Sequence, residues 1–417
     1  MKGITDMFYD NQPETNRQNY KRMLSIIGQL SNLFSENDAS YLAYRVHENV
    51  FCKYFEAENL ARTDCSADAK KDTIGIGLKT WVGNDDQKVA EFGKMKKFYT
   101  DLTGIELVKK IAEYRNERIR VTKNLHGIVD MIYHVVKRIP GAMQIMECAF
   151  DYIDIDKIKL IPNRGNENNT YFKDDKHTYH FSVSKNTLYM IFEELELLDV
   201  VKVEILEDPY SLLEKATQEH NNMEADIYNI SVDTEMHYLE RESFKDKNLL
   251  ARYIRKDEQR KNQLCLPLYT RNKTGKFVAE KSGLNQWNAG GRKRDVNEIY
   301  IPYQKVDRDR KMDFFPPRDT PFTLHMPDGS EISAKVCQEA DRNNPAIGKS
   351  IMSNPNKVLG KWLLRDVFEM EEGTVLTYEM LEKFGIDSVI FTKNGDLDYS
   401  IDFAEIGTYE EFYGIEE

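Results

Sequence analysis

The sequence predicts an α+β protein of more than one domain, with an α/β N-terminal part and a mostly β C-terminal part. A chain of 417 residues is too long for one ordinary hydrophobic core. Helical and strand patterns mix up to about residue 210, whereas short strands separated by Gly, Pro and Asn turns dominate from residue 264. We therefore expect an N-terminal domain over residues 1–210, a helical linker over 211–261 and a barrel-like domain over 262–417.

The expected elements of the N-terminal domain follow from the spacing of apolar residues. Residues 14–62 carry apolar residues at helical spacing on both sides of the break SENDAS, which predicts two helices. Residues 65–82 predict a strand, a turn and a second strand. Helices are expected over about 85–102 and 105–124, and alternating strand patterns follow up to residue 210.

Charge is distributed unevenly along the chain. The net charge of −12 argues against a wholly basic protein that coats nucleic acid. Residues 245–294 nevertheless hold 14 Lys/Arg against 4 Asp/Glu, whereas residues 366–417 hold 2 Lys against 15 Asp/Glu. A local basic surface is what DNA binding requires, so the first stretch is a candidate contact region.

The compartment is expected to be the cytoplasm, without membrane association. No apolar run approaches the ~20 residues that span a bilayer, and the N-terminus shows no apolar core of a signal peptide. The five cysteines are scattered and odd in number, with no CxxC pair. This pattern indicates neither a zinc knuckle nor a disulfide framework.

The stretch GLNQWNAGGRKRDVNEIYIP, residues 283–302, has the composition of a DNA-reading arm. Asn285, Gln286 and Asn288 carry amides suited to paired hydrogen bonds with adenine, and Trp287 offers a ring that can stack on a base. The cations that follow suit guanine edges and phosphates; they are Arg292, Lys293 and Arg294. The alternative is a solvated surface loop.

Several ordered motifs in the last third of the chain resemble the C-terminal domain of NgoFVII-type restriction endonucleases. The motifs are LCLPLYTRNKTGKFVAEKSGLNQWNAGGRKRDVNEIYIP, FFPPRDTPFTLHMPDGSEISAKV, SNPNKVLGKWLLRDV and GIDSVIFTK. The resemblance implies a pseudobarrel similar to the plant B-three DNA-binding fold, which grips the DNA major groove with two arms. The first arm maps to residues 286–294, and Asn285 directly before it is a further candidate DNA contact. The second maps to about 335–357, and its candidate contacts are Lys335, Gln338, Lys349, Ser353, Asn354 and Lys357.

Residues 64–81, DCSADAKKDTIGIGLKTW, carry the second chemical signal. Asp68 and Lys79 are spaced to lie on adjacent antiparallel strands, with the acid and the lysine at one edge. The segment resembles the PD-(D/E)xK nuclease core, in which acidic residues hold a divalent cation and the lysine helps to position the attacking water. The resemblance implies Mg²⁺ as the cofactor, because carboxylate oxygens suit that ion. The alternative is that Asp68 caps a turn and Lys79 is a solvated strand end.

The segment departs from the PD-(D/E)xK pattern at one position. An acid is expected two residues before the lysine, where this chain has Gly77. Some members of that superfamily take the second carboxylate from a neighbouring helix, and Glu48 is the candidate here, as a catalytic residue and metal ligand. The remaining options are Glu56, Glu58, Asp64 and Asp72.

The expected function is that of a type II restriction endonuclease, a site-specific deoxyribonuclease that hydrolyses phosphodiester bonds with Mg²⁺. The expected partners are double-stranded DNA and a second copy of the chain in a homodimer. A regulator that binds DNA without cleaving it and a nuclease directed at modified DNA remain open alternatives. NgoFVII-type enzymes resemble phospholipase D nucleases in their catalytic half and need an HxK motif, which none of the eight histidines begins.

Overall fold

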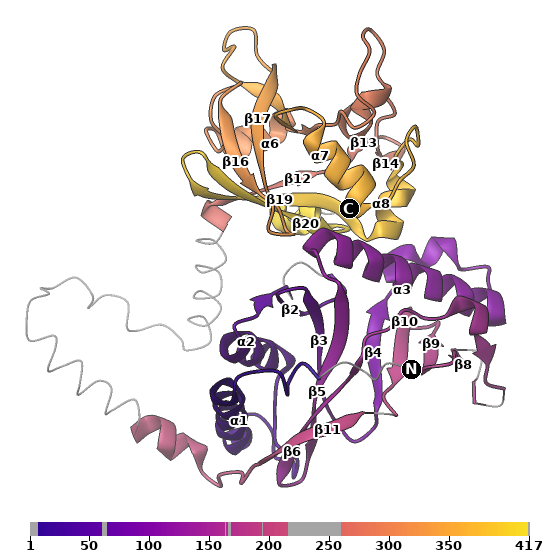
Figure 1. The fold of residues 1–417 in the computed structure, drawn as a ribbon, viewed down its shortest axis with the longest axis vertical. Coiled ribbons are helices and arrows are strands. Elements are labelled where there is room, and N and C mark those ends of the chain that lie inside the picture. Colours follow the sequence, from indigo (N-terminus) through magenta and orange to yellow (C-terminus); the bar gives the residue numbers. More distant parts are fainter. Residues whose placement is uncertain are drawn as a thin grey trace, which may run out of the picture.

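The computed structural model describes residues 7–60, 65–162, 164–165, 168–193, 195–215 and 260–415. Figure 1 shows an N-terminal half of mixed sheets and helices and a C-terminal half built as a nearly closed barrel. This arrangement confirms the predicted α+β fold class. Most of the predicted linker, over 216–259, lies outside the described residues, so the predicted domain boundaries stay a prediction.

The main sheet of the N-terminal half has six strands in the described part of the chain. Their order is β1 (Glu58–Asn59), β2 (Ala69–Lys71), β3 (Ile74–Val82), β5 (Asp130–Ile139), β6 (Ala142–Ala149) and β11 (Glu196–Lys202). Neighbouring strands are antiparallel except for β3 and β5. Helix α3 (Gly104–His126) lies between these two parallel strands in the sequence, as a crossover connection requires.

Two hydrophobic clusters cover the two faces of this sheet. On one face, α1 (Glu14–Gln29) and α2 (Tyr44–Phe55) pack Leu24 and Phe51 against Ile76 and Leu78 of β3. The other cluster joins α3 with Tyr133 and Val135 of β5 and with a second sheet. The N-terminal half also contains the short helices η1 (Ser31–Leu33) and η3 (Ile155–Lys157).

The second sheet corrects one predicted helix. Its order is β4 (Asp86–Glu91), β10 (Thr187–Ile191), β9 (Thr178–Ser182), β8 (Asn169–Lys173) and β7 (Lys159–Leu160). The predicted helix over 85–102 is wrong, because the structure forms β4 and then η2 (Gly93–Phe98). Pairing with β10, which sets Asp86 opposite Ile191, outweighs the helical preference of this Lys-rich stretch. The predicted helices over 14–62 and 105–124 and the hairpin over 65–82 are confirmed.

The C-terminal half is a seven-stranded sheet, in the described residues, that curls until its ends meet. Its order is β12 (Gln263–Pro267), β19 (Ile386–Gly395), β20 (Asp398–Glu405), β16 (Pro321–His325), β17 (Glu331–Glu339), β18 (Gly348–Ser353) and β15 (Ile301–Pro302). All pairs are antiparallel except β16 with β20. The terminal strands β12 and β15 approach each other without forming a ladder, which leaves a seam.

Several short helices and one hairpin connect the strands of the barrel or follow them. They are the hairpin β13 (Thr270–Asn272) and β14 (Gly275–Phe277), with η4 (Gly283–Asn288), α6 (Lys305–Arg310), α7 (Val358–Gly360), η5 (Lys361–Val367), α8 (Tyr378–Phe384) and α9 (Thr408–Tyr413). The segments that follow β14 and β17 project from the end of the barrel that lies away from the N-terminal half (Figure 1). In the described part of the chain, no helix is both long and apolar enough to cross a membrane.

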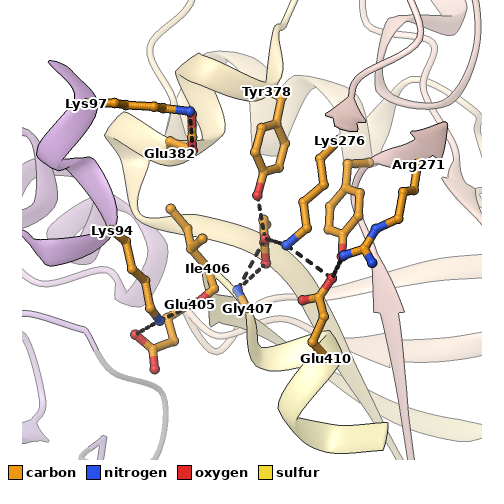
Figure 2. Close-up of polar contacts among 12 residues, drawn as sticks. Lys94, Lys97, Arg271, Lys276, Tyr378, Glu382, Glu405, Ile406, Gly407 and Glu410 are labelled. Atoms are coloured by element: carbon orange, nitrogen blue, oxygen red, sulfur yellow. Dashed lines mark hydrogen bonds and ion pairs between the residues drawn. The ribbon is translucent and has the colours of Figure 1, made fainter. Parts of the chain in front are cut away.

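Helix α3 and η2 join the two halves. Figure 2 shows Lys97 and Lys94 of η2 reaching Glu382 and Glu405 of the C-terminal half, with Nζ–Oε2 distances of 2.8 and 3.2 Å. From α3, Arg120 donates to the carbonyl oxygens of Val367 and Phe368 at 3.3 and 3.1 Å. Each of these bonds ties a helix of one half to the backbone or an acid of the other.

Apolar packing across the same boundary is the basis of a stability prediction. Leu125, near the end of α3, is 3% exposed and belongs to the hydrophobic cluster of the barrel. Leu125→Ala should lower the free energy of unfolding of the C-terminal half by about 2–5 kcal/mol, because it opens a cavity in that core. Hydrogen exchange of β19 and β20 checks the expectation. Lys109→Ala on the same helix is the control, and equal protection in both variants would contradict it.

Candidate functional site

The base of the first arm is anchored inside the barrel by Asn285. Its side chain is fully buried and donates to the carbonyl oxygens of Ala279 and Leu376, at 3.1 and 2.9 Å. Its amide oxygen accepts from the Leu376 backbone N–H at 2.9 Å. With its amide fully used and no exposed surface, Asn285 supports the arm in this structure and presents no edge to a DNA base, contrary to the expectation from the sequence.

Arg294 folds back under the arm and holds its loop. Its Nη1 donates to the carbonyl oxygens of Ala289 and Gly290 at 2.6 and 2.7 Å, and only 12% of its side chain is exposed. With its amide oxygen turned toward the guanidinium, Gln286 accepts from Arg294 Nε at 3.0 Å. Glu298 is nearly buried and lies 3.5 Å from the same Nε. Through these contacts, Arg294 stabilises the conformation of the loop between η4 and β15.

The exposed side chains of the first arm are therefore a smaller set than the sequence suggested. Arg292 is 55% exposed and pairs one nitrogen with Glu298, and Lys293 is exposed. Asn288 is half-buried and donates to the carbonyl oxygen of Glu280 at 3.0 Å. Trp287 packs against the hydrophobic cluster of the barrel, so its ring is a packing anchor for the arm. Arg292 and Lys293 are the members best placed to meet DNA.

The second arm, over about 335–357, consists of the end of β17, the exposed loop that follows it, β18 and the turn before α7. Gln338, Lys349 and Asn354 are exposed, and Lys357 is 60% exposed. Lys335 is partly buried and forms an ion pair with Asp319, with an Nζ–Oδ1 distance of 2.9 Å.

Ser353 has a supporting position instead. Its side chain is 1% exposed, and its hydroxyl oxygen accepts from the Leu359 backbone N–H at 2.9 Å. The hydroxyl thereby caps the turn that leads into α7. The two arms also approach each other, because Lys357 Nζ lies 4.0 Å from Oδ2 of Asp295, the residue directly after the first arm.

In the N-terminal half, Asp68 and Lys79 meet at the edge of the β2–β3 hairpin, as predicted. Asp68 Oδ2 accepts from the Leu78 backbone N–H at 2.7 Å and lies 3.9 Å from Lys79 Nζ. Both side chains are about one quarter exposed, at 27% and 26%. The pair is thus held by strand geometry while its polar atoms remain open to a ligand.

Glu48 on α2 belongs to the same electrostatic environment. Burial raises the pKa of the Glu48 carboxyl; the charge of Asp68 raises it further, while Arg45 and Lys79 lower it. Its Oε2 accepts from Arg45 Nη1 at 2.9 Å, and only 8% of the side chain is exposed. The structure therefore brings Glu48 of α2, Asp68 directly before β2 and Lys79 of β3 into one electrostatic environment.

The missing acid of the motif has a steric explanation. A Cβ atom on Gly77 would lie 2.7 Å from Tyr133 Cδ1 and 3.0 Å from Phe150 Cε1. The rings of Tyr133 and Phe150 stack with their centroids 4.1 Å apart, so neither ring has room to yield. A side chain at position 77 would force these buried rings to shift, so a second carboxylate is better supplied from elsewhere.

The other candidate acids are less well placed. Glu56 is 77% exposed and lies 3.8 Å from Lys71 at the edge of the sheet. Glu58 is exposed, and its charge adds to the burial that raises the pKa of Asp402. Asp72 is exposed in the hairpin turn, and Asp64 lies outside the described residues.

The donors at this site suit Mg²⁺ in type. Two carboxylates supply only oxygen atoms, and Mg²⁺ is commonly held by one or two carboxylates with waters and substrate phosphates. Within the described ranges, no group of three or more His, Cys, Asp or Glu is arranged to hold a metal ion. Glu48 and Asp68 would therefore form an incomplete shell that water and a DNA phosphate complete.

A buried polar chain next to this region was missed at the sequence level. Tyr20 Oη lies 3.0 Å from His47 Nε2 and 3.0 Å from His134 Nε2, and His134 Nδ1 lies 2.7 Å from Glu147 Oε1. All four side chains are buried. The chain fixes the orientation of His47, the neighbour of Glu48 on α2, and so helps to hold that helix against the sheet. Tyr20, His134 and Glu147 are far apart in the sequence, so no local pattern indicated this chain.

The crowding at Gly77 leads to a prediction for the variant that restores the family acid. Gly77→Asp should destabilise the N-terminal half by about 1–3 kcal/mol from overpacking, with a further cost for the buried charge. Urea unfolding followed by tryptophan fluorescence measures the loss. Gly93→Asp, at a position with nothing within 4 Å of its Cβ and no left-handed backbone, is the control for adding an acid. A Gly77→Asp protein as stable as wild type would show that this account is wrong.

Comparison with known proteins bears on the C-terminal half. The model of the NgoFVII C-terminal B3-like DNA-binding domain family matches residues 258–394, which is a minority of the chain but includes both arms. No curated protein matches the chain. The match agrees with the seven-stranded, nearly closed barrel and confirms the resemblance seen in the sequence motifs. The C-terminal part of this chain is therefore an NgoFVII-type B3-like DNA-binding domain.

Proposed function

We propose that the chain is a sequence-specific double-stranded DNA endonuclease of the type II restriction class that depends on Mg²⁺. The observation that carries the proposal is the Asp68–Lys79 pair, 3.9 Å apart with Glu48 in the same region, on a chain that carries a DNA-binding domain. A DNA-binding domain brings the substrate, and an acid–lysine pair beside a second acid is suited to hydrolysis of its backbone.

Each residue would have a distinct part in the reaction. Asp68 and Glu48 would hold the cation, which when bound stabilises negative charge on the phosphate. Lys79 would orient the attacking water or contact the phosphate, since its ammonium group is partly exposed beside Asp68. The Leu78 N–H fixes one oxygen of Asp68, so the carboxylate is oriented before any ligand arrives.

The central test separates cleavage from binding. Asp68→Asn and Lys79→Ala should each abolish Mg²⁺-dependent cleavage of unmethylated bacteriophage DNA on a gel. Binding of a duplex selected from a random pool should stay within a few-fold of wild type, because the arms are untouched. Asp72→Asn, in the turn of the same hairpin, and Lys71→Ala are the matched controls and should cleave normally.

Three outcomes would speak against the proposal. Cleavage by either Asp68→Asn or Lys79→Ala would remove this pair from the reaction. Sequence-specific binding by a wild-type chain that never cuts would favour a DNA-binding regulator. Cleavage confined to methylated DNA would favour a nuclease directed at modified bases.

The raised pKa of Glu48 predicts how cleavage depends on pH. A carboxyl must be ionised to hold a cation, so activity should fall on acidification at a higher pH than the ordinary glutamate value of 4.5. Because the folded-state pKa is raised, the stability contribution of Glu48 is present below pH 4.5 and is lost as the pH rises through the folded value. Glu48→Gln should therefore abolish cleavage without lowering stability at neutral pH. The cleavage rate as a function of pH and urea unfolding of both proteins test these expectations. A Glu48→Gln protein that cleaves normally would show that another acid is the second metal ligand.

The arms should divide into residues that read DNA and residues that support the loop. Arg292→Ala should cost roughly 1–3 kcal/mol of binding free energy and relax preference at one base pair, if the guanidinium meets a guanine. Lys293→Ala should weaken all sequences alike and reduce the salt slope by about one. Arg294→Ala should lower affinity without changing preference and expose the loop to protease, because this side chain holds the loop backbone. Competition with single-base variants measures all three, and an altered preference in Arg294→Ala would contradict its supporting role.

A further inference from the structure

A cavity of about 250 Å³ opens at the seam of the barrel, between the roots of the two arms. Its walls come from the end of β12 and the start of β13, from the residues just before η4, from β15, and from β17 and β18. The cavity thus lies between strands β12 and β15, which do not pair with each other, at the point where both arms leave the barrel. The volume is below the ~300–1,000 Å³ of pockets that hold drug-sized ligands, which suits a single small ring system.

The walls combine flat or apolar surfaces with free polar groups. Leu268, Pro302 and Tyr269 supply apolar and aromatic surface. Gln304, Gln338, Lys349 and Tyr300 line the same space. In the part of the chain that the structure describes, none of these last four side chains makes a hydrogen bond or an ion pair, so their polar groups are available to a ligand.

Such a combination matches the chemistry of a nucleobase. A base turned out of a duplex is held by stacking against apolar or aromatic side chains and by hydrogen bonds to its pairing edge. A glutamine amide offers both a donor and an acceptor, as each base edge requires. An exposed lysine at the rim suits the phosphate that accompanies the base.

The backbone at the rim of the cavity has an unusual conformation at Gln338. Gln338 has a φ of +58°, in the left-handed region that residues other than glycine rarely adopt. The register on either side, Cys337 with Ser350 and Glu339 with Gly348, sets Gln338 opposite Lys349. Strain of this kind is maintained where a side chain must point in a specific direction, often at a ligand site.

Buried charged residues hold the side chain of Tyr269, the aromatic wall of the cavity. The Tyr269 hydroxyl donates to Glu410, which lies 3.1 Å from Lys276 Nζ. Lys276 Nζ in turn lies 3.7 Å from Asp387, which accepts from the Tyr378 hydroxyl at 3.0 Å. Figure 2 shows Arg271 and Lys276 converging on Glu410 from the β13–β14 hairpin. The ring of Tyr269 is therefore held in place as one side of the cavity.

We propose that this cavity receives one base of the bound duplex, turned out of the helix as the two arms grip the DNA. The inference rests on the proposed sequence-specific binding of DNA and adds to it a second mode of reading. The arms would read base edges in the groove, while the cavity would test the identity of the extruded base through Gln304 and Gln338.

The test uses the full chain and a duplex selected from a random pool. Each base pair in turn is replaced by a mismatch that keeps one strand unchanged, and binding is measured by competition. Turning out a base costs least where it is already unpaired. One position should therefore bind about tenfold more tightly as a mismatch, with 2-aminopurine there becoming fluorescent on binding, whereas mismatches elsewhere should weaken binding.

Filling the cavity supplies the matched variant. Ala279→Trp places a ring in the cavity and should abolish the mismatch preference and the fluorescence change. Leu397→Trp, exposed in the β19–β20 turn, is the control and should keep both. Gln304→Leu, which lines the cavity but lies outside both arms, should lose base preference at the same site if Ala279→Trp does not fold.

Two results would overturn the inference while leaving the proposed function standing. One is a duplex series in which every mismatch weakens binding or leaves it unchanged. The other is an Ala279→Trp protein with wild-type affinity and an unchanged mismatch profile. Failure to select any sequence would overturn the sequence-specific binding on which both proposals depend.

Discussion

Helix α3 belongs to two hydrophobic cores at once, and the arrangement of the molecule depends on that. Its first turns place Leu107, Val108 and Ile111 in the core between the two N-terminal sheets, whereas Val121 and Leu125 lie in the core of the barrel. A helix is rigid over this length, so burying both ends fixes the direction of one half relative to the other. Apolar burial provides the stabilisation, and the Arg120 bonds to Val367 and Phe368 set the register.

The two arms are also positioned by buried groups. Buried groups such as Asn285 and Glu298 hold the arm at its root, and the cations at the tip remain exposed. A buried amide left without partners is costly, so Asn285 ties the arm to Leu376, before α8, through two hydrogen bonds and to Ala279 through a third. A pre-ordered arm loses less conformational entropy on binding than a free loop would.

The positions of the arms and of the candidate cleavage site constrain how they work together. The arms project from the end of the barrel away from the N-terminal half, whereas α2, β2 and β3 lie below the barrel (Figure 1). A duplex held at the arm tips would have to run along the side of the molecule to reach the β2–β3 hairpin of the same chain. Under the proposed function, this geometry favours cutting beyond the gripped base pairs, or cutting by a second copy of the chain.

The sequence by itself determined the features that depend on local pattern. Apolar spacing identified α1, α2 and α3, the β2–β3 hairpin with Asp68 and Lys79, and the β-rich C-terminal part. These features depend on side-chain periodicity and turn residues that are readable within a few positions. The family motifs around the first arm were equally local, and the family match confirmed them.

Tertiary structure decided whatever depends on contacts between distant residues. The stretch 85–102 became β4 and η2 because β10, about a hundred positions away, supplies a partner strand. Asn285 and Arg294 became supports because Leu376 and the arm backbone consume their polar groups. The absence of an acid at Gly77 follows from the rings of Tyr133 and Phe150, and the cavity at the seam exists because β12 and β15 meet without pairing. Burial and hydrogen-bond partners across the chain are properties of the folded state, so no local pattern encodes them.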